Sequence, residues 1–192
     1  DLFMRIWNPD GNEAEACGNA TRCVARLAID ETGKNCIDIE TVAGILPSIA
    51  TDEGVIAVDM GEPRLDWQSI PLASEQDTLS VDLGHDAPAP AVCVNMGNPH
   101  AVLFVDDCYA VDLPVTGRAL EHHPVFPERA NISFCTVESR NRIRTRVWER
   151  SAGATLACGS AACAIAVAGV RRELTDCEVT VALPGGDLAM HL

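Results

Sequence analysis

Residues 146–170 read RVWERSAGATLACGSAACAIAVAGV, and residues 5–29 read RIWNPDGNEAEACGNATRCVARLAI. In both segments Arg-(Ile/Val)-Trp is followed, twelve residues after its arginine, by the cysteine of an Ala-Cys-Gly motif. The offset between the copies is 141 residues, and the later pairs Cys36/Cys177 and Gly44/Gly185 keep it. A single offset that holds over some forty residues indicates two related units in one chain.

Hydrophobic periodicity predicts which elements these units contain. Residues 2–7 and 142–150 alternate as strands do. A helix should follow each Ala-Cys-Gly: the first ends at Gly33, and the second, from Ser160 to about Val170, is apolar on all sides and so must be enclosed. The first helix is expected to turn inward Ala20, Cys23, Val24, Leu27 and Ala28. Further short strands are expected at residues 54–60, 91–95, 101–105 and 132–137.

The fold expected from this pattern is α+β. We predict two pseudo-symmetric units, residues 1–60 and residues 61–192, each a curved mixed β-sheet wrapped around a central helix. Quasi-symmetric units would place an active site in the cleft between them, where the two Ala-Cys-Gly motifs meet.

The same offset predicts segments outside the chain. It places the partner of Asn98 before residue 1, and the partner of the strand at residues 55–58 after Leu192. We therefore expect the first unit to be incomplete, because part of the N-terminus is missing, and the second unit to be nearly complete, with only the extreme C-terminus missing.

Composition excludes several functions. A net charge of −14 and a pI near 4.6 argue against nucleic acid and anionic membranes as partners. There is no apolar run of membrane-spanning length and no signal-peptide pattern, so a soluble cytoplasmic protein is expected. Lys34 is the only lysine and lies in a turn, so it is a poor anchor for pyridoxal phosphate, and we expect a reaction without a cofactor.

The nine cysteines include no Cys-x-x-Cys pair, which argues against a disulfide framework and a zinc site, and no metal is expected. Two cysteines, Cys23 and Cys163, are expected to pack on the inner faces of the helices. Five others are expected to be buried thiols in a reducing compartment: Cys36, Cys93, Cys108, Cys135 and Cys177.

The remaining two, Cys17 and Cys158, each stand directly before a predicted helix. Backbone N–H groups and the helix dipole favour negative charge there. A free thiol is only about 3% thiolate at pH 7, and lowering its pKa to about 7 takes roughly 2 kcal/mol, which a helix N-terminus can supply. The same N–H groups can bind a carboxylate.

Two such thiols indicate proton transfer at a carbon. One thiolate removes the α-proton from one face, and the other thiol delivers a proton to the opposite face, as an amino-acid racemase or epimerase requires. A Cys–His hydrolase would have no reason to duplicate its cysteine. The alternative without chemistry is a pair of small buried cysteines where helices pack closely.

At these residues the chain resembles diaminopimelate epimerase over nearly its whole length. The matching segments are Arg5–Gly11, Ala16–Asn19, Gly97–His100, Asn131–Ile132, Trp148–Arg150 and Ala157–Gly159. The resemblance implies the fold of that family and conversion of L,L-2,6-diaminopimelate to the meso isomer, a step toward lysine and peptidoglycan. It also implies a small-molecule substrate as the partner; the sequence does not determine the oligomeric state and leaves a homodimer open.

The resemblance assigns roles to individual residues. Cys17 and Cys158 would be the catalytic thiols, and His100 would lie near them. The reacting carboxylate would be bound at the helix starts by Gly18, Asn19, Gly159 and Ser160. The distal end of the substrate would be held by Asn8, Asn98, Asn131, Glu149 and Arg150.

Taken without the family, these polar residues have ordinary explanations. Arg150 suits a carboxylate but could be a surface arginine, and Glu149 could bind an ammonium or cap local backbone. The asparagines are typical turn residues. His100, which follows a proline in a turn, could be a solvated histidine.

The chain also departs from the family pattern. The usual Gly-Ala-Gly-Glu-Thr is replaced by Ser151-Ala152-Gly153-Ala154-Thr155, and alanine stands at Ala20 and Ala161 near the expected carboxylate site. Three alternatives remain open: a proline or hydroxyproline racemase of the same fold, an inactive fragment, and a thiol-redox protein, which the lack of Cys-x-x-Cys disfavours.

Overall fold

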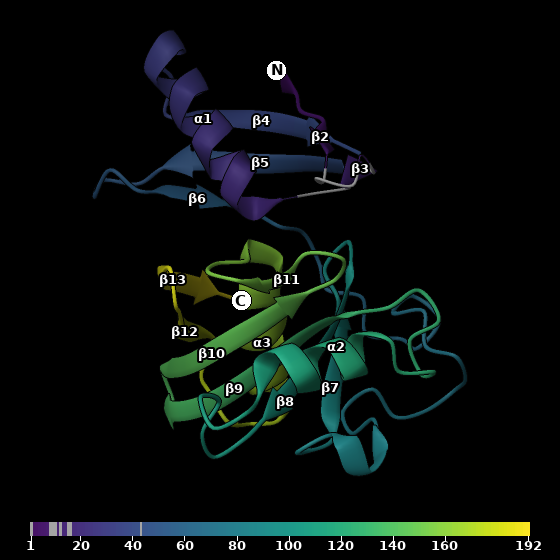
Figure 1. Ribbon diagram of the computed structural model, residues 1–192. Helices are drawn as coiled ribbons and strands as arrows, with labels where there is room; N and C mark the ends of the chain where they lie inside the picture. The colour runs from purple at the N-terminus through teal and green to yellow at the C-terminus, as the bar shows by residue number, and fades with distance from the viewer. Residues whose placement is uncertain (1, 8–10, 12, 15–16, 43) are drawn as a thin grey trace. The chain divides into compact units, whose positions relative to one another are not determined.

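The chain folds as two units, Asp1–Glu62 and Pro63–Leu192, in the computed structural model shown in Figure 1. The structure describes residues 2–7, 11, 13–14, 17–42 and 44–192. The boundary between the two units that was predicted from the sequence lies after residue 60 instead. Among the described residues, no helix has the length and apolar character needed to cross a membrane.

The first unit packs one helix against a four-stranded sheet. Helix α1 (Gly18–Thr32) begins after Cys17 and ends at Gly33, whose left-handed backbone (φ 67°) closes the last turn. The sheet has the order β1 (Leu2–Phe3), β4 (Cys36–Thr41), β5 (Gly44–Ala50), β6 (Ile56–Val58), with only β1 and β4 parallel. Strands β2 (Ile6–Trp7) and β3 (Glu13–Ala14) form a separate two-stranded ribbon.

The core of this unit shows why these strands form. Ile37 and Ile39 alternate with exposed residues along β4, as a half-buried strand requires. They pack with the helix residues Ala25, Ala28 and Ile29. The buried positions of α1 are therefore small residues together with one isoleucine.

The predicted inward face of α1 was only partly right. Ala28 is buried as predicted, and Ala20 and Val24 are partly buried against the core. The helix buries Gly18, Thr21, Ala25, Ala28 and Ile29, whereas Leu27 is 65% exposed and Cys23 is also exposed. Both flanks of the helix contain apolar residues, so periodicity did not discriminate between them. Small residues on the buried face let the helix lie close to the sheet, and the Thr21 hydroxyl is satisfied by donating to the Cys17 carbonyl (3.0 Å).

The second unit is built on a seven-stranded mixed sheet. Six strands form the main path and β11 (Gly153–Thr155) pairs with β10, while the pairs β10–β12 and β8–β9 are parallel. The path runs in the order β13 (Gly186–His191), β12 (Glu178–Leu183), β10 (Arg142–Glu149), β9 (Asn131–Ser139), β8 (Pro99–Phe104), β7 (Ala91–Asn95).

Helix α3 (Gly159–Arg171) packs against this sheet and is buried on nearly all sides, which confirms the prediction of an enclosed helix. Ile143, Thr145 and Val147 are the buried positions of β10, in the predicted alternation. Gly169 allows close packing here, because a Cβ at that position would lie 2.5 Å from Thr175 Oγ1.

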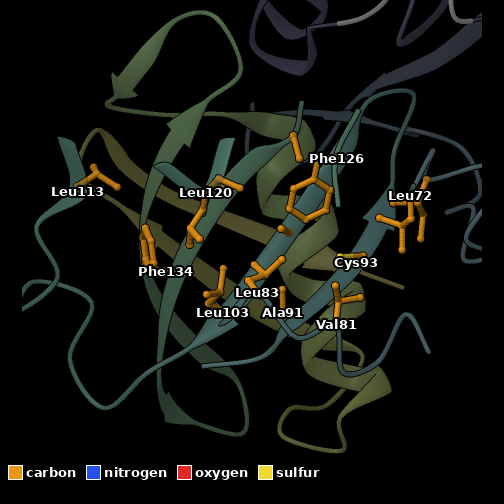
Figure 2. Close-up of a cluster of buried hydrophobic side chains, with 14 of the residues drawn as sticks. Leu72, Val81, Leu83, Ala91, Cys93, Leu103, Leu113, Leu120, Phe126 and Phe134 are labelled. Carbon is orange, nitrogen blue, oxygen red and sulfur yellow. The ribbon is translucent and has the colours of Figure 1, made fainter. Parts of the chain in front are cut away.

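A second apolar layer contains the largest buried side chains of the unit (Figure 2). Leu103 and Phe134 from β8 and β9 pack there with Leu83, Leu120 and Phe126. Leu120 belongs to the short helix α2 (Arg118–Glu121), which follows a π-helical turn, η2 (Leu113–Gly117). A 3-10 turn, η1 (Gly84–Asp86), precedes β7. Strands of this sheet are thus buried on both faces, which explains their continuous apolar runs.

The cysteines divide by burial. Cys93, Cys108 and Cys135 are buried, as predicted, and Cys163 is partly buried. The prediction was wrong for Cys36 and Cys177, which are exposed. Cys36 begins β4 on the outward side of its alternation, and Cys177 directly precedes β12.

Candidate active site

Each unit contains a helix that starts directly after a cysteine, and the two starts have the same backbone geometry. Cys17 precedes α1 with φ −146° and ψ 104°, and Cys158 precedes α3 with φ −139° and ψ 114°. In both, the cysteine carbonyl accepts a helical N–H four residues on, from Thr21 (2.9 Å) and from Ala162 (3.1 Å). The repeat read in the sequence is therefore also a repeat of local structure.

The environment of Cys158 differs from the sequence expectation. Burial raises the pKa of the Cys158 thiol to about 12, and the nearby Glu149 carboxylate adds to this, against the opposing effects of the Ser160 hydroxyl and the Ala161 N–H. The helix start was expected to lower this pKa toward neutrality. Burial and a neighbouring negative charge outweigh it here, so Cys158 is a thiol, and thus a proton donor, in this state.

Glu149 lies at that thiol, at the end of β10. The antiparallel pairing of β10 with β11 places Thr155 opposite Val147, and the Thr155 hydroxyl donates to Glu149 Oε1 (2.5 Å). The carboxylate also shares a hydrogen bond with the Cys158 thiol that favours its protonated form. Sequence reasoning assigned Glu149 to the distal end of the substrate and missed Thr155 altogether.

Three further residues that the sequence singled out are joined by hydrogen bonds beside this segment. His100 Nε2 lies 2.7 Å from Asn98 Oδ1. Asn131 donates to the Pro99 carbonyl (3.0 Å) and accepts from the Arg150 backbone N–H (2.9 Å). Asn131 therefore connects the strand that contains His100 to the turn after β10.

His100 is fully buried in β8, which excludes a solvated turn histidine. Burial, with a smaller effect from the Arg150 guanidinium, lowers the pKa of His100 to about 3, so the imidazole is neutral. Within the described part of the chain, His100 Nδ1 is buried without a hydrogen-bond partner. Leaving a buried polar atom without a partner costs free energy, so this atom requires an explanation.

The structure thus groups most of the proposed site residues within the second unit. The hydrogen bonds and electrostatic interactions described above connect the following residues: Asn98, His100, Asn131, Glu149, Arg150 and Cys158. Gly159 and Ser160 lie next to them, at the start of α3. Cys17, Gly18 and Asn19 form the start of α1 in the first unit, where Asn19 Oδ1 accepts from Arg22 (2.7 Å). Asn8 lies outside the described residues.

No set of three or more His, Cys, Asp or Glu side chains in the described ranges is arranged to hold a metal ion. The polar groups of the site are instead arranged as a thiol next to a carboxylate, a neutral imidazole and an arginine. Such a set can exchange protons and bind carboxylates.

Comparison with solved structures defines the class to which this fold belongs. A phenazine biosynthesis protein of the PhzF family from Bacillus anthracis superposes with a TM-score of 0.66 at 17% identity, over 97% of this chain and 70% of that one. A probable proline racemase from Agrobacterium radiobacter K84 gives 0.67 at 16%, over 99% and 63%. The chain therefore shares the α+β fold of these two proteins.

Sequence comparison defines the family within that class. The diaminopimelate epimerase family model matches residues 1–65 and 92–192. The diaminopimelate epimerase of Rhodospirillum centenum is 54% identical over 188 residues, and that of Brucella anthropi is 52% identical over 199. The chain belongs to the diaminopimelate epimerase family. It spans 65% and 66% of the lengths of these two relatives, and they cover 98% and 100% of it.

Proposed function

We propose that this protein epimerises L,L-2,6-diaminopimelate to the meso isomer, without a cofactor, by using Cys17 and Cys158 as an acid–base pair. The main support is the matching start of α1 and α3, where a cysteine with the same backbone conformation precedes each helix. A reaction that must treat both faces of one carbon alike needs such a duplication.

The proton inventory of one turnover follows from the state of Cys158. Cys158 begins as the thiol, because burial and Glu149 favour its protonated form, so the mechanism requires Cys17 to act as the base. Cys17 takes the α-proton, and Cys158 delivers its own proton to the opposite face of the resulting carbanion. The cycle ends with Cys17 as the thiol and Cys158 as the thiolate, so the reverse reaction uses the same groups with exchanged roles.

The helix starts are suited to bind the reacting carboxylate. The backbone N–H groups at Gly18 and Asn19, and at Gly159 and Ser160, lie at the positive ends of α1 and α3. Negative charge that develops next to the carboxylate during proton removal is stabilised by the same dipoles.

The distal amino-acid end of the substrate needs a separate polar site. The Arg150 guanidinium can hold the distal carboxylate, with Asn98 and Asn131 beside it and Asn8 as a further ligand. Because Glu149 contacts Cys158, we assign it to the control of that thiol's protonation. A substrate with two charged ends also accounts for more of these residues than proline would.

The product would serve lysine and peptidoglycan synthesis, and we propose a cytoplasmic location. Support comes from the nine cysteines, which include no Cys-x-x-Cys pair and do not have the pattern of a disulfide framework.

The test is a stereochemical assay on the purified full-length protein. L,L-diaminopimelate should be converted to the meso isomer, as resolved by chiral chromatography, while L-proline and trans-4-hydroxy-L-proline should be left unchanged. The Cys17→Ala and Cys158→Ala variants should each lose conversion. Racemisation of proline without conversion of diaminopimelate would instead favour the proline racemase alternative.

A further inference from the structure

Glu121 is a buried carboxylate that the mechanism above does not use. It is the last residue of helix α2, and it is only 3% exposed. The sequence around it contains no motif that would mark it as a binding residue. A carboxylate removed from water in this way is costly unless its oxygens are hydrogen-bonded. Its partners therefore indicate what it holds in place.

Both oxygens of Glu121 accept hydrogen bonds from the end of β10 and the turn that follows it. Oε2 accepts from the Trp148 indole Nε1 (2.7 Å), and Oε1 accepts from the Ser151 backbone N–H (3.0 Å). Arg129 Nη1, 3.8 Å from Oε1, supplies partial charge compensation. One side chain thus binds the residues on both sides of the pair Glu149–Arg150.

The conformation that Glu121 holds is not one the chain adopts readily. Ser151 has φ 64°, in the left-handed region, which is unfavourable for a residue with a Cβ. The Trp148 side chain lies close to two glycines: a Cβ at Gly117 would be 2.7 Å from Trp148 Cβ, and one at Gly153 would be 3.5 Å from Trp148 Cη2. The Arg150 N–H is fixed separately by Asn131. Without Glu121, the segment Trp148–Ser151 would lose the two hydrogen bonds that hold its first and last residues.

We propose that Glu121 is a positioning residue of the active site, which clamps Trp148–Ser151 so that the Glu149 carboxylate faces Cys158 and the Arg150 guanidinium faces the substrate. The inference rests on the proposed function for its kinetic consequence. Its structural consequence, the placement of Glu149 at the Cys158 thiol, can be measured whether or not diaminopimelate is the substrate.

The decisive variant is Glu121→Gln, which keeps the size of the side chain but offers one acceptor oxygen in place of two. An amide NH₂ would then face either the indole N–H or the Ser151 N–H, so one of the two bonds must break. Trp148→Phe removes only the indole donor and leaves the Ser151 bond. Exposed Glu75→Gln is the control for the change in charge.

Steady-state kinetics of the full-length protein give the first readout. We expect kcat/KM for L,L-diaminopimelate to fall about tenfold or more in Glu121→Gln, the range for loss of a hydrogen bond to a charged group. Trp148→Phe should lose less, and Glu75→Gln should match the wild type. A folded Glu121→Gln protein with unchanged kcat/KM would overturn the proposal, and Trp148→Phe decides if the first variant does not fold.

The second readout does not depend on turnover. The pH dependence of Cys158 alkylation by iodoacetamide, followed by peptide mass spectrometry, should move to lower pH in Glu121→Gln because Glu149 leaves the thiol. In a Glu149→Gln background the same substitution should add little further shift, since its effect passes through Glu149. A full additional shift in that background would show that Glu121 acts only on general packing. If the wild type does not epimerise diaminopimelate, the proposed function fails while this measurement still decides the role of Glu121.

Discussion

Substitution of Gly117 by alanine should destabilise the protein through Trp148. A Cβ on Gly117 would lie 2.7 Å from Trp148 Cβ and 2.8 Å from its Cγ, far inside the 3.5–4.0 Å of a normal carbon–carbon contact. The ring cannot move away without straining its hydrogen bond to Glu121 (2.7 Å). Gly117 otherwise has an ordinary right-handed helical backbone (φ −60°, ψ −46°), so the clash alone opposes a side chain there.

The magnitude follows from three contributions. Overpacking costs about 1–3 kcal/mol, and a weakened hydrogen bond to a carboxylate costs about 1.5–3 kcal/mol. Replacing glycine by alanine in a helical conformation returns up to about 1 kcal/mol. With the full 1 kcal/mol returned, we expect the free energy of unfolding to fall by about 1.5–5 kcal/mol.

Urea unfolding followed by circular dichroism measures this change. The same substitution in a Trp148→Gly background should cost much less, because the Cβ and Cγ atoms that would clash are gone. If Gly117→Ala were as stable as the wild type, or cost the same in both backgrounds, the assigned contact between Gly117 and Trp148 would be incorrect.

Three further predictions concern single residues. Ser151→Gly should raise the free energy of unfolding by up to about 1 kcal/mol in urea titrations, because glycine adopts φ 64° without strain; a loss of stability would contradict this explanation of the family's usual glycine. Because His100 has a folded-state pKa of about 3, below its unfolded value of 6.5, its contribution to stability is complete above pH 6.5 and is lost as the pH falls toward 3. His100→Phe should flatten that acid limb of the stability–pH curve, and an unchanged slope would argue against a neutral buried imidazole. The raised pKa of Cys158, about 12 against 9.0, has the opposite sign: its contribution is complete below pH 9 and is lost as the pH rises toward 12. Glu149→Gln should lower this pKa, so that alkylation of Cys158 begins at lower pH, whereas a shift to higher pH would refute the contact.

The elements nearest the repeat could be predicted from sequence. The duplicated Ala-Cys-Gly motif predicts where both helices start. Because the two copies keep the same offset along the repeat, Cys17 and Cys158 must take equivalent positions, each directly before its helix. The all-apolar sequence of α3 requires burial on every side, and the structure shows it. Local chemistry was sufficient for these features.

Other features depend on contacts that sequence patterns do not encode. The inward face of α1 was predicted wrongly at Cys23 and Leu27, because the buried face consists largely of small residues and Leu27 is exposed. Glu121 and Trp148 are hydrogen-bonded although they are 27 residues apart in the sequence. Glu121 belongs to a helix of four residues, which is too short to show a hydrophobic periodicity. The contact of Glu149 with Cys158 follows from the pairing of β10 with β11, a register that only the folded sheet determines.

The ionisation of Cys158 was also beyond sequence reasoning. The helix dipole favours the thiolate, and this part of the argument holds for any cysteine at a helix start. Burial and the Glu149 carboxylate act in the opposite direction and are stronger. Only the three-dimensional environment gives the balance, and it indicates which thiol begins the cycle with the proton.

The isotope content of early product tests the two-thiol mechanism most directly. L,L-diaminopimelate is incubated with the full-length protein in D₂O, and product and recovered substrate are analysed by mass spectrometry after a few per cent conversion. If Cys17 and Cys158 each serve one face, the delivering thiol carries deuterium from solvent. The meso product should then contain one deuterium at the inverted carbon, and recovered substrate almost none. Deuterium in recovered substrate at the level found in product, or original protium returned to the product, would contradict the assignment of the two cysteines.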